Sequence, residues 1–345
     1  MIVKEREIPQ SLLQLIAIKN RLANNHPQIS FVTDDLLNQL SGYRGENSLD
    51  YYLKAVDEKN IYILHSVRLL HQQYFQMDTI ILTPYFILVI EVKNYRGQVA
   101  FDHQFGQMQR ITNGMEQTFK DPITQIETQA LHLQNWLLSK GISGLPVETL
   151  VVFSNNHVKL TRSGELDVDD RIIRASKLIE RINLLKKNYS NQVLSPYRIQ
   201  QLAHLMKSES KPLLTNQLQK YQLTQNDIIP GVICPACHQN TMNRTHGRWE
   251  CHKCLSTNKM AHRSALKEYQ LLFLRKTITN REARWMMQVE SLEMMSKLLI
   301  RMKLDYQGEK RHRKYYLNFD YQTDYHYLLD TLNRRGKNLS MKSYQ

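Results

Sequence analysis

The sequence MDTIILTPYFILVIEVKN, residues 77–94, contains two apolar runs separated by a turn that includes Pro84. Apolar runs of this length on either side of a turn are typical of a β-hairpin. Side chains alternate between the two faces of a strand, so Glu91 and Lys93 point to one face and Val92 to the other. We therefore expect a buried hairpin with charged residues where its strands end.

Two acids and a lysine stand at these strand ends, namely Asp78, Glu91 and Lys93. Burying charge is costly unless the charges are paired or hold a metal ion. Mg²⁺ prefers carboxylate and water oxygens, and a nearby lysine adds positive charge where a phosphodiester develops negative charge. The pattern predicts a divalent-cation site beside a phosphodiester. The simpler alternative is that Asp78 caps a turn and that Glu91 and Lys93 form a surface ion pair.

Four segments with this context occur in order along the chain. They are GYRGE at 42–46, MDTIILTP at 77–84, VIEVKN at 89–94 with Gly97, and PITQ at 122–125. Together they resemble the nuclease-related domain (NERD) family, a branch of the PD-(D/E)xK phosphodiesterase superfamily. The resemblance covers roughly residues 38–155. It implies an α/β (α+β) fold, in which a mixed sheet is flanked by helices in the restriction-endonuclease-like manner.

The resemblance also implies a role for each matching residue. Asp78 and Glu91 would ligate Mg²⁺ or Mn²⁺, and Lys93 would orient or help to activate the attacking water. Glu46, expected at the N-terminal turn of a helix that begins near Gly45, would be an additional acid. Gln125 would lie at the margin of the site and position water or backbone phosphate.

All four cysteines fall in one short segment with the spacing C-x₂-C-x₁₃-C-x₂-C: Cys234, Cys237, Cys251 and Cys254. Two such pairs supply four thiolates, which suits tetrahedral Zn²⁺ and predicts a structural zinc ribbon. A redox dithiol pair and an iron–sulfur site are the alternatives. Clustering of the cysteines in a metal site is typical of a reducing compartment, so we expect a cytoplasmic protein.

The charge is uneven along the chain. Residues 231–345 hold 21 Lys and Arg against 10 Asp and Glu, a net charge of +11, whereas the remainder holds 25 against 22. A basic C-terminal third favours a polyanionic partner, most simply nucleic acid, although a basic surface also aids solubility. The longest apolar run, 80–92, is too short to span a bilayer, so we expect no membrane partner.

The basic third also carries a helical pattern. Thr279 is a candidate N-cap, and a break near Glu290 separates two helices, the second predicted at 292–303. After Gly308, a basic and aromatic strand resembles the wing of a winged-helix domain. The alternative is an ordinary helical hairpin with a basic surface. The residues that we expect to contact nucleic acid are Arg244, Arg248, Arg311, Arg313 and Lys314.

These features predict five segments and a function. The hypothesis is a metal-dependent nuclease, directed to DNA or RNA by the ribbon and the basic module. The alternatives are a non-catalytic nucleic-acid-binding protein on a nuclease-like scaffold, and a ribbon and tail that bind proteins in a larger assembly. The segments are a helical extension at 1–37, the nuclease-related domain at 38–190, a helical linker at 191–230, the Cys₄ ribbon at 231–260 and the basic segment at 265–345.

Overall fold

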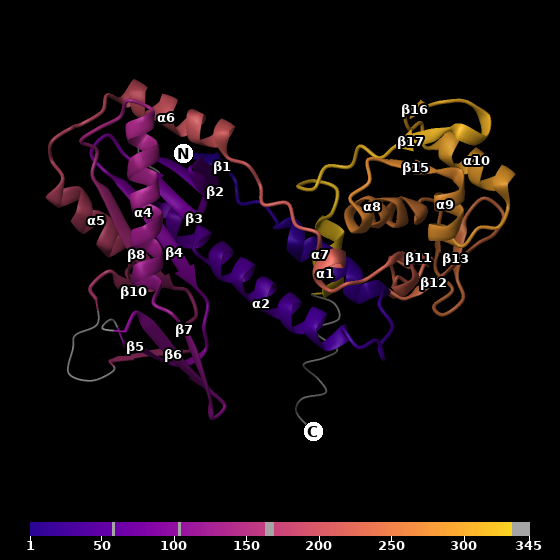
Figure 1. Cartoon of the computed structure of the whole chain (residues 1–345), viewed down its shortest axis with the longest axis horizontal. Helices are drawn as coiled ribbons and strands as arrows, with labels where there is room; N and C mark the ends of the chain where they lie inside the picture. The colour runs from indigo at the N-terminus through magenta and orange to yellow at the C-terminus, as the bar shows by residue number, and fades with distance from the viewer. Residues whose placement is uncertain (57–58, 103–104, 163–168, 333–345) are drawn as a thin grey trace. The chain divides into compact units, whose positions relative to one another are not determined.

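The computed structural model describes residues 1–56, 59–102, 105–162 and 169–332 (Figure 1). The chain divides into two compact units. The first unit consists of Met1–Glu7 and Leu40–Leu213, and the second consists of Ile8–Gln39 and the chain from Leu214 onward. The short N-terminal segment therefore belongs to the same unit as the chain that follows residue 39.

A mixed six-stranded sheet forms the centre of the first unit, with the order β1-β2-β3-β4-β8-β10. Strand β3 pairs antiparallel with both β2 and β4. The pairs β1–β2, β4–β8 and β8–β10 are parallel. The strands are β1 (Ile2–Lys4), β2 (Tyr62–His71), β3 (Gln73–Leu82), β4 (Ile87–Lys93), β8 (Val147–Phe153) and β10 (Ile172–Arg174).

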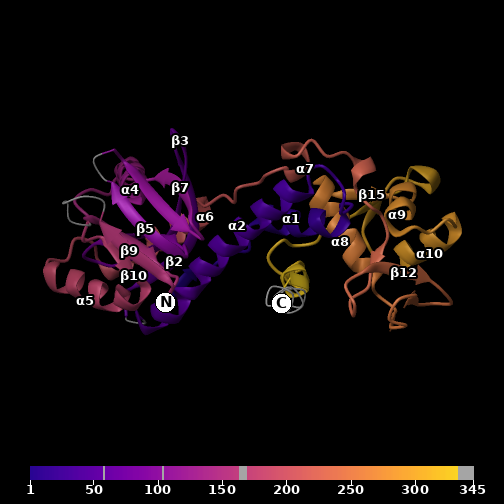
Figure 2. The same ribbon diagram turned by 90° about the horizontal axis from the view of Figure 1, so that it is seen from below.

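Helices cover both faces of this sheet. Helices α4 (Pro122–Ser139) and α6 (Pro196–Glu209) bury their apolar residues against one face, and α5 (Leu178–Asn188) packs against the other (Figures 1 and 2). Helix α4 begins where the sequence places it, since Asp121 caps it by accepting a hydrogen bond from the Ile123 N–H over 2.9 Å. The predicted fold class, a mixed sheet flanked by helices, is confirmed.

A second, four-stranded sheet of order β7-β6-β5-β9 extends the first unit. Its strands β6 and β7 form a hairpin that turns at Asn113 and Gly114, both with positive φ. The strands are β5 (Gly97–Asp102), β6 (Gln107–Thr112), β7 (Met115–Lys120) and β9 (Val158–Arg162).

The hairpin predicted at residues 77–94 is formed by β3 and β4. Thr83 closes its turn, because its hydroxyl donates to the Phe86 carbonyl over 2.7 Å and accepts from the Tyr85 and Phe86 N–H groups. Successive side chains of β4 enter the cores on opposite faces, with Val89 on the α4 side and Ile90 on the α5 side. The alternation that the sequence predicts is therefore present.

Helix α2 (Ile29–Ser48) differs from the sequence prediction. The prediction that a helix begins near Gly45 is wrong, because Gly45 lies in the last turns of a helix that begins at Ile29. Glu46 is accordingly near the C-terminal end of its helix and not in its first turn. The short helices α3 (Asp50–Leu53) and η1 (Lys54–Val56) follow α2.

The second unit contains a small antiparallel sheet, β11-β12-β13-β14, followed by helices and a three-stranded sheet of order β15-β17-β16. Thr279 caps α9 with a capping box, as the sequence predicts, and Ser291, next to the predicted break, caps α10. The elements are α1 (Gln10–Arg21), α7 (Gln217–Lys220), η3 (Gln225–Asp227), β11 (Val232–Ile233), β12 (Asn240–Arg244), β13 (Trp249–Cys251), β14 (Thr257–Asn258), α8 (His262–Phe273), β15 (Thr277–Thr279), α9 (Asn280–Met287), α10 (Leu292–Arg301), β16 (Tyr306–Gln307), η4 (Lys310–His312) and β17 (Lys314–Tyr316).

A buried ion pair ties the N-terminal helix α1 to α8 within the second unit. Arg21 Nε donates to Glu268 Oε2 over 2.6 Å, and Arg21 Nη1 donates to the carbonyls of Ile229 and Gly231 over 3.1 Å each. A buried charge pair is tolerated when further hydrogen bonds satisfy its polar atoms. The segment Ile8–Gln39 is therefore part of the second unit's core.

Candidate active site and metal centre

Asp78 and Glu91 meet where β3 separates from β4. The ladder pairs Thr79 with Ile90, so the next position in the same register places Asp78 opposite Glu91. Asp78 Oδ2 also accepts a hydrogen bond from the backbone N–H of Val92 over 2.9 Å. The hairpin register therefore holds these two carboxylates next to each other at one edge of the sheet.

Glu91 is 4% exposed, and both of its carboxylate oxygens have partners. Oε1 accepts hydrogen bonds from Lys93 Nζ over 2.7 Å and from Gln125 Nε2 over 2.8 Å, and Oε2 accepts from Gln129 Nε2 over 3.1 Å. Lys93 Nζ also donates to Gln125 Oε1 over 2.9 Å. Gln129 is absent from the sequence prediction, although its position four residues after Gln125 on α4 places both on one helix face.

Gly45 brings helix α2 against the end of β4. A Cβ atom at Gly45 would lie 2.4 Å from Asn94 Cβ and 2.9 Å from Ser154 Oγ, so a larger residue would push the helix away. Asn94 Nδ2 in turn donates to the Ser41 carbonyl over 2.7 Å. This close approach carries Glu46, the next residue, to the edge of the sheet that holds Asp78 and Glu91.

Arg6 is a further member of the site that sequence reasoning missed. Its side chain is 3% exposed, and it donates to Glu46 Oε2 over 2.8 Å and to Asp50 Oδ1 over 3.1 Å. Arg6 Nη2 also lies 2.9 Å from His65 Nδ1 and 3.3 Å from Thr79 Oγ1. Arg6 stands 40 residues before Glu46, and no motif spacing marks it, so only the folded chain brings it here.

The three carboxylates form one electrostatic site. Burial raises the pKa of Asp78 well above its usual range, and the charges of Glu91 and Glu46 raise it further, against the opposing effects of the Val92 N–H and Lys93. Burial also raises the pKa of Glu46, with Arg6 opposing and Glu91 adding to the shift. Acids that raise one another's pKa favour a cation between them.

Lys93 remains charged in this environment. Burial opposes its charged form, but the Glu91 carboxylate outweighs burial and raises the pKa of Lys93 above its ordinary value. The raised pKa favours the ammonium form of Lys93, which can stabilise developing negative charge.

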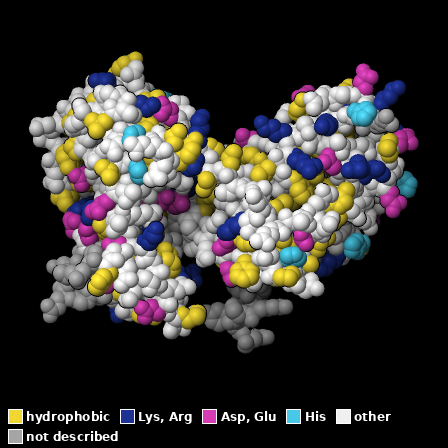
Figure 3. Space-filling model, in the orientation of Figure 1, with side chains coloured by type: hydrophobic (Ala, Val, Ile, Leu, Met, Phe, Trp, Pro, Cys, Tyr) yellow, Lys and Arg dark blue, Asp and Glu magenta, His cyan; other side chains and the backbone are white. Residues whose placement is uncertain are grey.

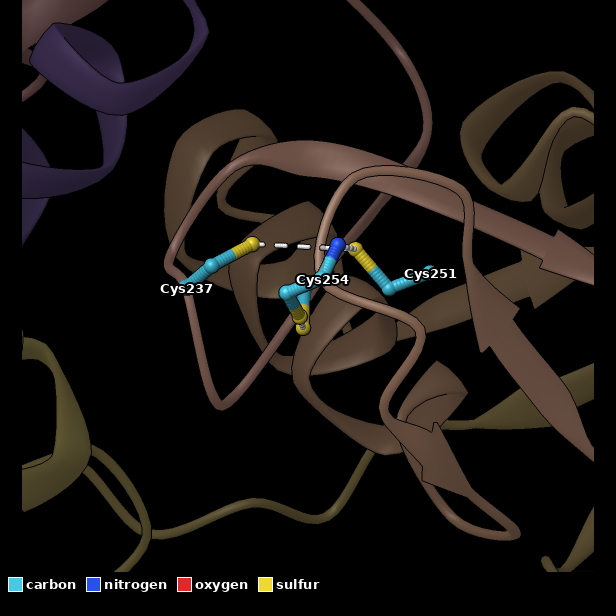
Figure 4. Close-up of side chains that lie close together, drawn as sticks. Cys237, Cys251 and Cys254 are labelled. Atoms are coloured by element: carbon cyan, nitrogen blue, oxygen red, sulfur yellow. Dashed lines mark hydrogen bonds between the residues drawn. The ribbon is translucent and has the colours of Figure 1, made fainter.

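The four cysteines lie together in the ribbon. The sulfur atoms of all four lie within 4.8 Å of one another, with 3.7 Å between Cys234 and Cys254 and 3.6 Å between Cys237 and Cys251. Figure 4 shows the sulfur atoms of Cys237 and Cys251 facing each other. Four ligands about 2.3 Å from a tetrahedral Zn²⁺ are about 3.8 Å apart, so the cluster is compatible with a zinc ribbon.

Hydroxyl groups surround these sulfurs. Ser256 Oγ lies 3.1 Å from the sulfurs of both Cys234 and Cys254, and Thr241 Oγ1 lies 3.0 Å from that of Cys251. Neighbours of this kind orient metal ligands and stabilise thiolates. Among the described residues, the four cysteines are the group of three or more potential metal ligands whose donor atoms all lie within 4.8 Å of one another. The carboxylates of Glu46, Asp78 and Glu91 do not meet this distance.

The residues expected to contact nucleic acid lie in different places on the second unit. Arg244 and Arg248 stand at the two sides of the β12–β13 hairpin, and Arg248 faces Glu250 at 3.6 Å. Arg313 stacks over the Tyr306 ring at 4.1 Å and precedes Lys314 in β17. The side chain of Arg311 lies outside the described part of the structure. Figure 3 shows Lys and Arg side chains gathered on the face of this unit that the view presents.

Comparison with protein families finds a match within the first unit. Residues 41–154 match the nuclease-related domain family, NERD. The match spans the segments on which the resemblance rests and includes all five proposed active-site residues, from Glu46 to Gln125. Comparison with the curated proteins and with the solved structures found no match. No helix among the described residues has the length and apolar character needed to cross a membrane.

The nuclease-related domain ends well short of the structural unit that contains it. Arg6 and strand β1 precede the matched residues, and α5 and α6 follow them. The match supports a nuclease-related function for residues 41–154, and it covers no residue of the second unit. The cysteine cluster and the basic surface therefore rest on the geometry of this chain alone.

Proposed function

We propose that the nuclease-related domain is a metal-dependent nuclease that hydrolyses phosphodiester bonds in nucleic acid, with DNA as the first substrate to test. The supporting observation is that the β3–β4 register and the close packing of α2 on β4 bring Asp78, Glu91 and Glu46 to one sheet edge beside Lys93. Such a site attracts a cation and, through it, a phosphate group.

Asp78 and Glu91 would hold Mg²⁺ or Mn²⁺, with Glu46 as an additional acid. The bound ion would lower the pKa of a water molecule and offset charge on the transition state. Lys93, protonated and hydrogen-bonded to Glu91 and Gln125, would face the negative charge that develops on the phosphate. Gln125 and Gln129 would keep the Glu91 carboxylate in one orientation.

In this proposal the second unit binds the substrate. The four cysteines hold a structural Zn²⁺, since a Cys₄ site leaves no position open for water or substrate. The basic surface around the ribbon and β17 binds the phosphate backbone. Four metal-bound thiolates are typical of a reducing compartment, so we place the protein in the cytoplasm.

The test is cleavage by the purified chain with Mg²⁺ or Mn²⁺ on plasmid, linear duplex, single-stranded DNA and RNA. The variants are Asp78→Asn, Glu91→Gln and Lys93→Met, each of which changes charge with little change in shape. Loss of cleavage of at least about 100-fold in each supports the proposal, because removing one group that stabilises the transition state costs about that much. Glu127→Gln is the matched control, since Glu127 lies on α4 but pairs with Arg171 on the domain surface.

Two outcomes contradict the nuclease assignment. Cleavage that survives in all three variants points to another site or a contaminant. Salt-sensitive binding of nucleic acid with no metal-dependent cleavage of any substrate identifies a non-catalytic binding protein on a nuclease-like scaffold.

A further inference from the structure

A groove of about 610 Å³ lies between the ribbon hairpin and helix α10 in the second unit. Residues 244–247, at the turn between β12 and β13, form one wall. Helix α10 forms the other along its length, from Ser291 at its cap to Arg301 at its end. Ten residues of helix extend about 15 Å, which is long enough to follow several nucleotides of a strand.

Positive charge in this groove is not balanced. Lys297 pairs with Glu293 one turn earlier on α10, with 2.5 Å between Nζ and Oε1. Arg244 and Arg301 also line the groove, and within the described residues neither forms an ion pair with an acid. Burial lowers the pKa of Arg244, and the charge of Arg301 lowers it further, so the two guanidinium groups repel each other.

Arg244 packs beside the buried Trp249. Its guanidinium carbon lies 5.5 Å from the centre of the Trp249 ring, across the hairpin pair that the two residues form. Trp249 is fully buried, and its Nε1 donates to His262 Nδ1 over 3.1 Å. Among the described residues, Arg244 Nη1 is buried and has no hydrogen-bond acceptor. The side chain is therefore held with a donor group unused.

We propose that this groove binds the phosphate backbone of a nucleic acid, with Arg244 and Arg301 on neighbouring phosphates. A guanidinium group offers two parallel N–H donors to a phosphate, and an anion between two such groups removes their repulsion. The ribbon and α10 would then form a single surface that binds one nucleic-acid strand. This inference rests on the proposed function, because that function supplies nucleic acid as the ligand.

The experiment measures binding of a fluorescent 30-base-pair duplex, and of the matching single strand, to the full chain carrying Asp78→Asn, without added Mg²⁺ or Mn²⁺, at several salt concentrations. No metal-dependent cleavage is expected under these conditions, and no chelator is present that could remove zinc from the ribbon, so the result does not depend on whether the nuclease assignment is correct. We expect Arg301→Gln and Arg244→Gln each to weaken binding and to lower the slope of log affinity against log salt by about 1. Arg263→Gln is the control, since Arg263 is exposed on α8 outside the groove.

Arg301→Glu separates a binding role from a structural one. Arg301 is exposed, so the variant should fold, and the new carboxylate can pair with Arg244. We expect a higher melting temperature than that of Arg301→Gln together with a larger loss of binding. Unchanged affinity and salt slope in Arg301→Gln and Arg301→Glu would overturn the proposal. Equally tight, groove-dependent binding of poly-glutamate would also overturn it and assign an acidic protein partner.

Discussion

Arg6 Nη1 lies 2.8 Å from Glu46 Oε2, which joins the segment after strand β1 to the helix that carries the third acid of the site. Arg6 precedes the matched nuclease-related residues, 41–154, yet it orients a carboxylate inside them. Its Nη2 group donates to Asp50 and lies within hydrogen-bond distance of His65 Nδ1 and Thr79 Oγ1. A residue outside the matched domain therefore contacts an acid of the candidate active site.

Arg6 is predicted to position Glu46. Replacing Arg6 by Gln leaves the Glu46 carboxylate half-buried without its cation, so we expect metal affinity or cleavage to fall by about 10- to 100-fold, the usual loss when a residue that orients a metal ligand is removed. Titration of activity against Mn²⁺ measures this. Arg6→Lys should restore part of the loss because it keeps the charge. Equal activity in all three proteins at every Mn²⁺ concentration would contradict the role.

Asp78 is predicted to make the metal-free protein less stable as the pH rises. Because its folded pKa lies above the unfolded value of about 3.9, stability falls as the pH rises from about 4 through the raised pKa. Asp78→Asn is neutral at all pH values and can still accept from the Val92 N–H. With no divalent ion added, its melting temperature relative to the wild type should rise between pH 5 and pH 8, and added Mn²⁺ should stabilise only the wild type. A difference in melting temperature that does not change with pH would argue against a raised pKa of Asp78.

His65 is predicted to make the first unit sensitive to acid. Burial, followed by the charges of Arg6 and Lys4, lowers the pKa of His65 to about 3. The unfolded chain takes up a proton near pH 6.5 and the folded chain does not, so stability falls as the pH falls below about 6.5. At pH 5 the loss is about 2 kcal/mol. Urea unfolding of His65→Gln should show a flatter pH dependence over this range, and an identical slope in both proteins would refute the assignment.

The ribbon is predicted to contain one zinc ion per chain. Elemental analysis should find it, and Cys237→Ser should lose it, because three thiolates bind Zn²⁺ less tightly than four. Removal of the zinc ion with a strong chelator should unfold the ribbon and change the fluorescence of the buried Trp249. The β3–β4 site should keep its Mn²⁺ response in Cys237→Ser. Iron in place of zinc, or four thiols that react at once in the untreated protein, would contradict this prediction.

Local signals in the sequence account for much of the fold. The apolar runs around Pro84 predict the β3–β4 hairpin, Asp121 predicts the start of α4, and the cysteine spacing predicts the cluster. In each case the residues that decide the structure are near one another in the chain, so their geometry follows from turn, cap and ligand chemistry. Asn113 followed by Gly114 is also a strong local signal for a hairpin. It marks the β6–β7 turn, which the prediction omitted.

Contacts between distant segments account for the errors. Gly45 suggests a helix boundary, but the structure uses it inside α2, where the lack of a Cβ atom allows the helix to touch Asn94. Arg6 joins the site through packing of β1 on the sheet, and nothing in its local sequence indicates a partner, whereas Gln129 shares a helix face with Gln125 and could have been found from that spacing. The electrostatic coupling of Glu46 to Asp78 depends on that same packing.

Strand β1 has a practical consequence for work on the isolated domain. It pairs with β2 through Ile2 and Lys4 and forms one border of the central sheet. A fragment that starts at residue 41 would leave the backbone groups of β2 near Ile63 and Leu64 without their β1 partners, and exposed strand edges promote association between molecules. Fragments designed for expression should therefore retain the first seven residues, or supply a replacement for them, so that this edge stays paired.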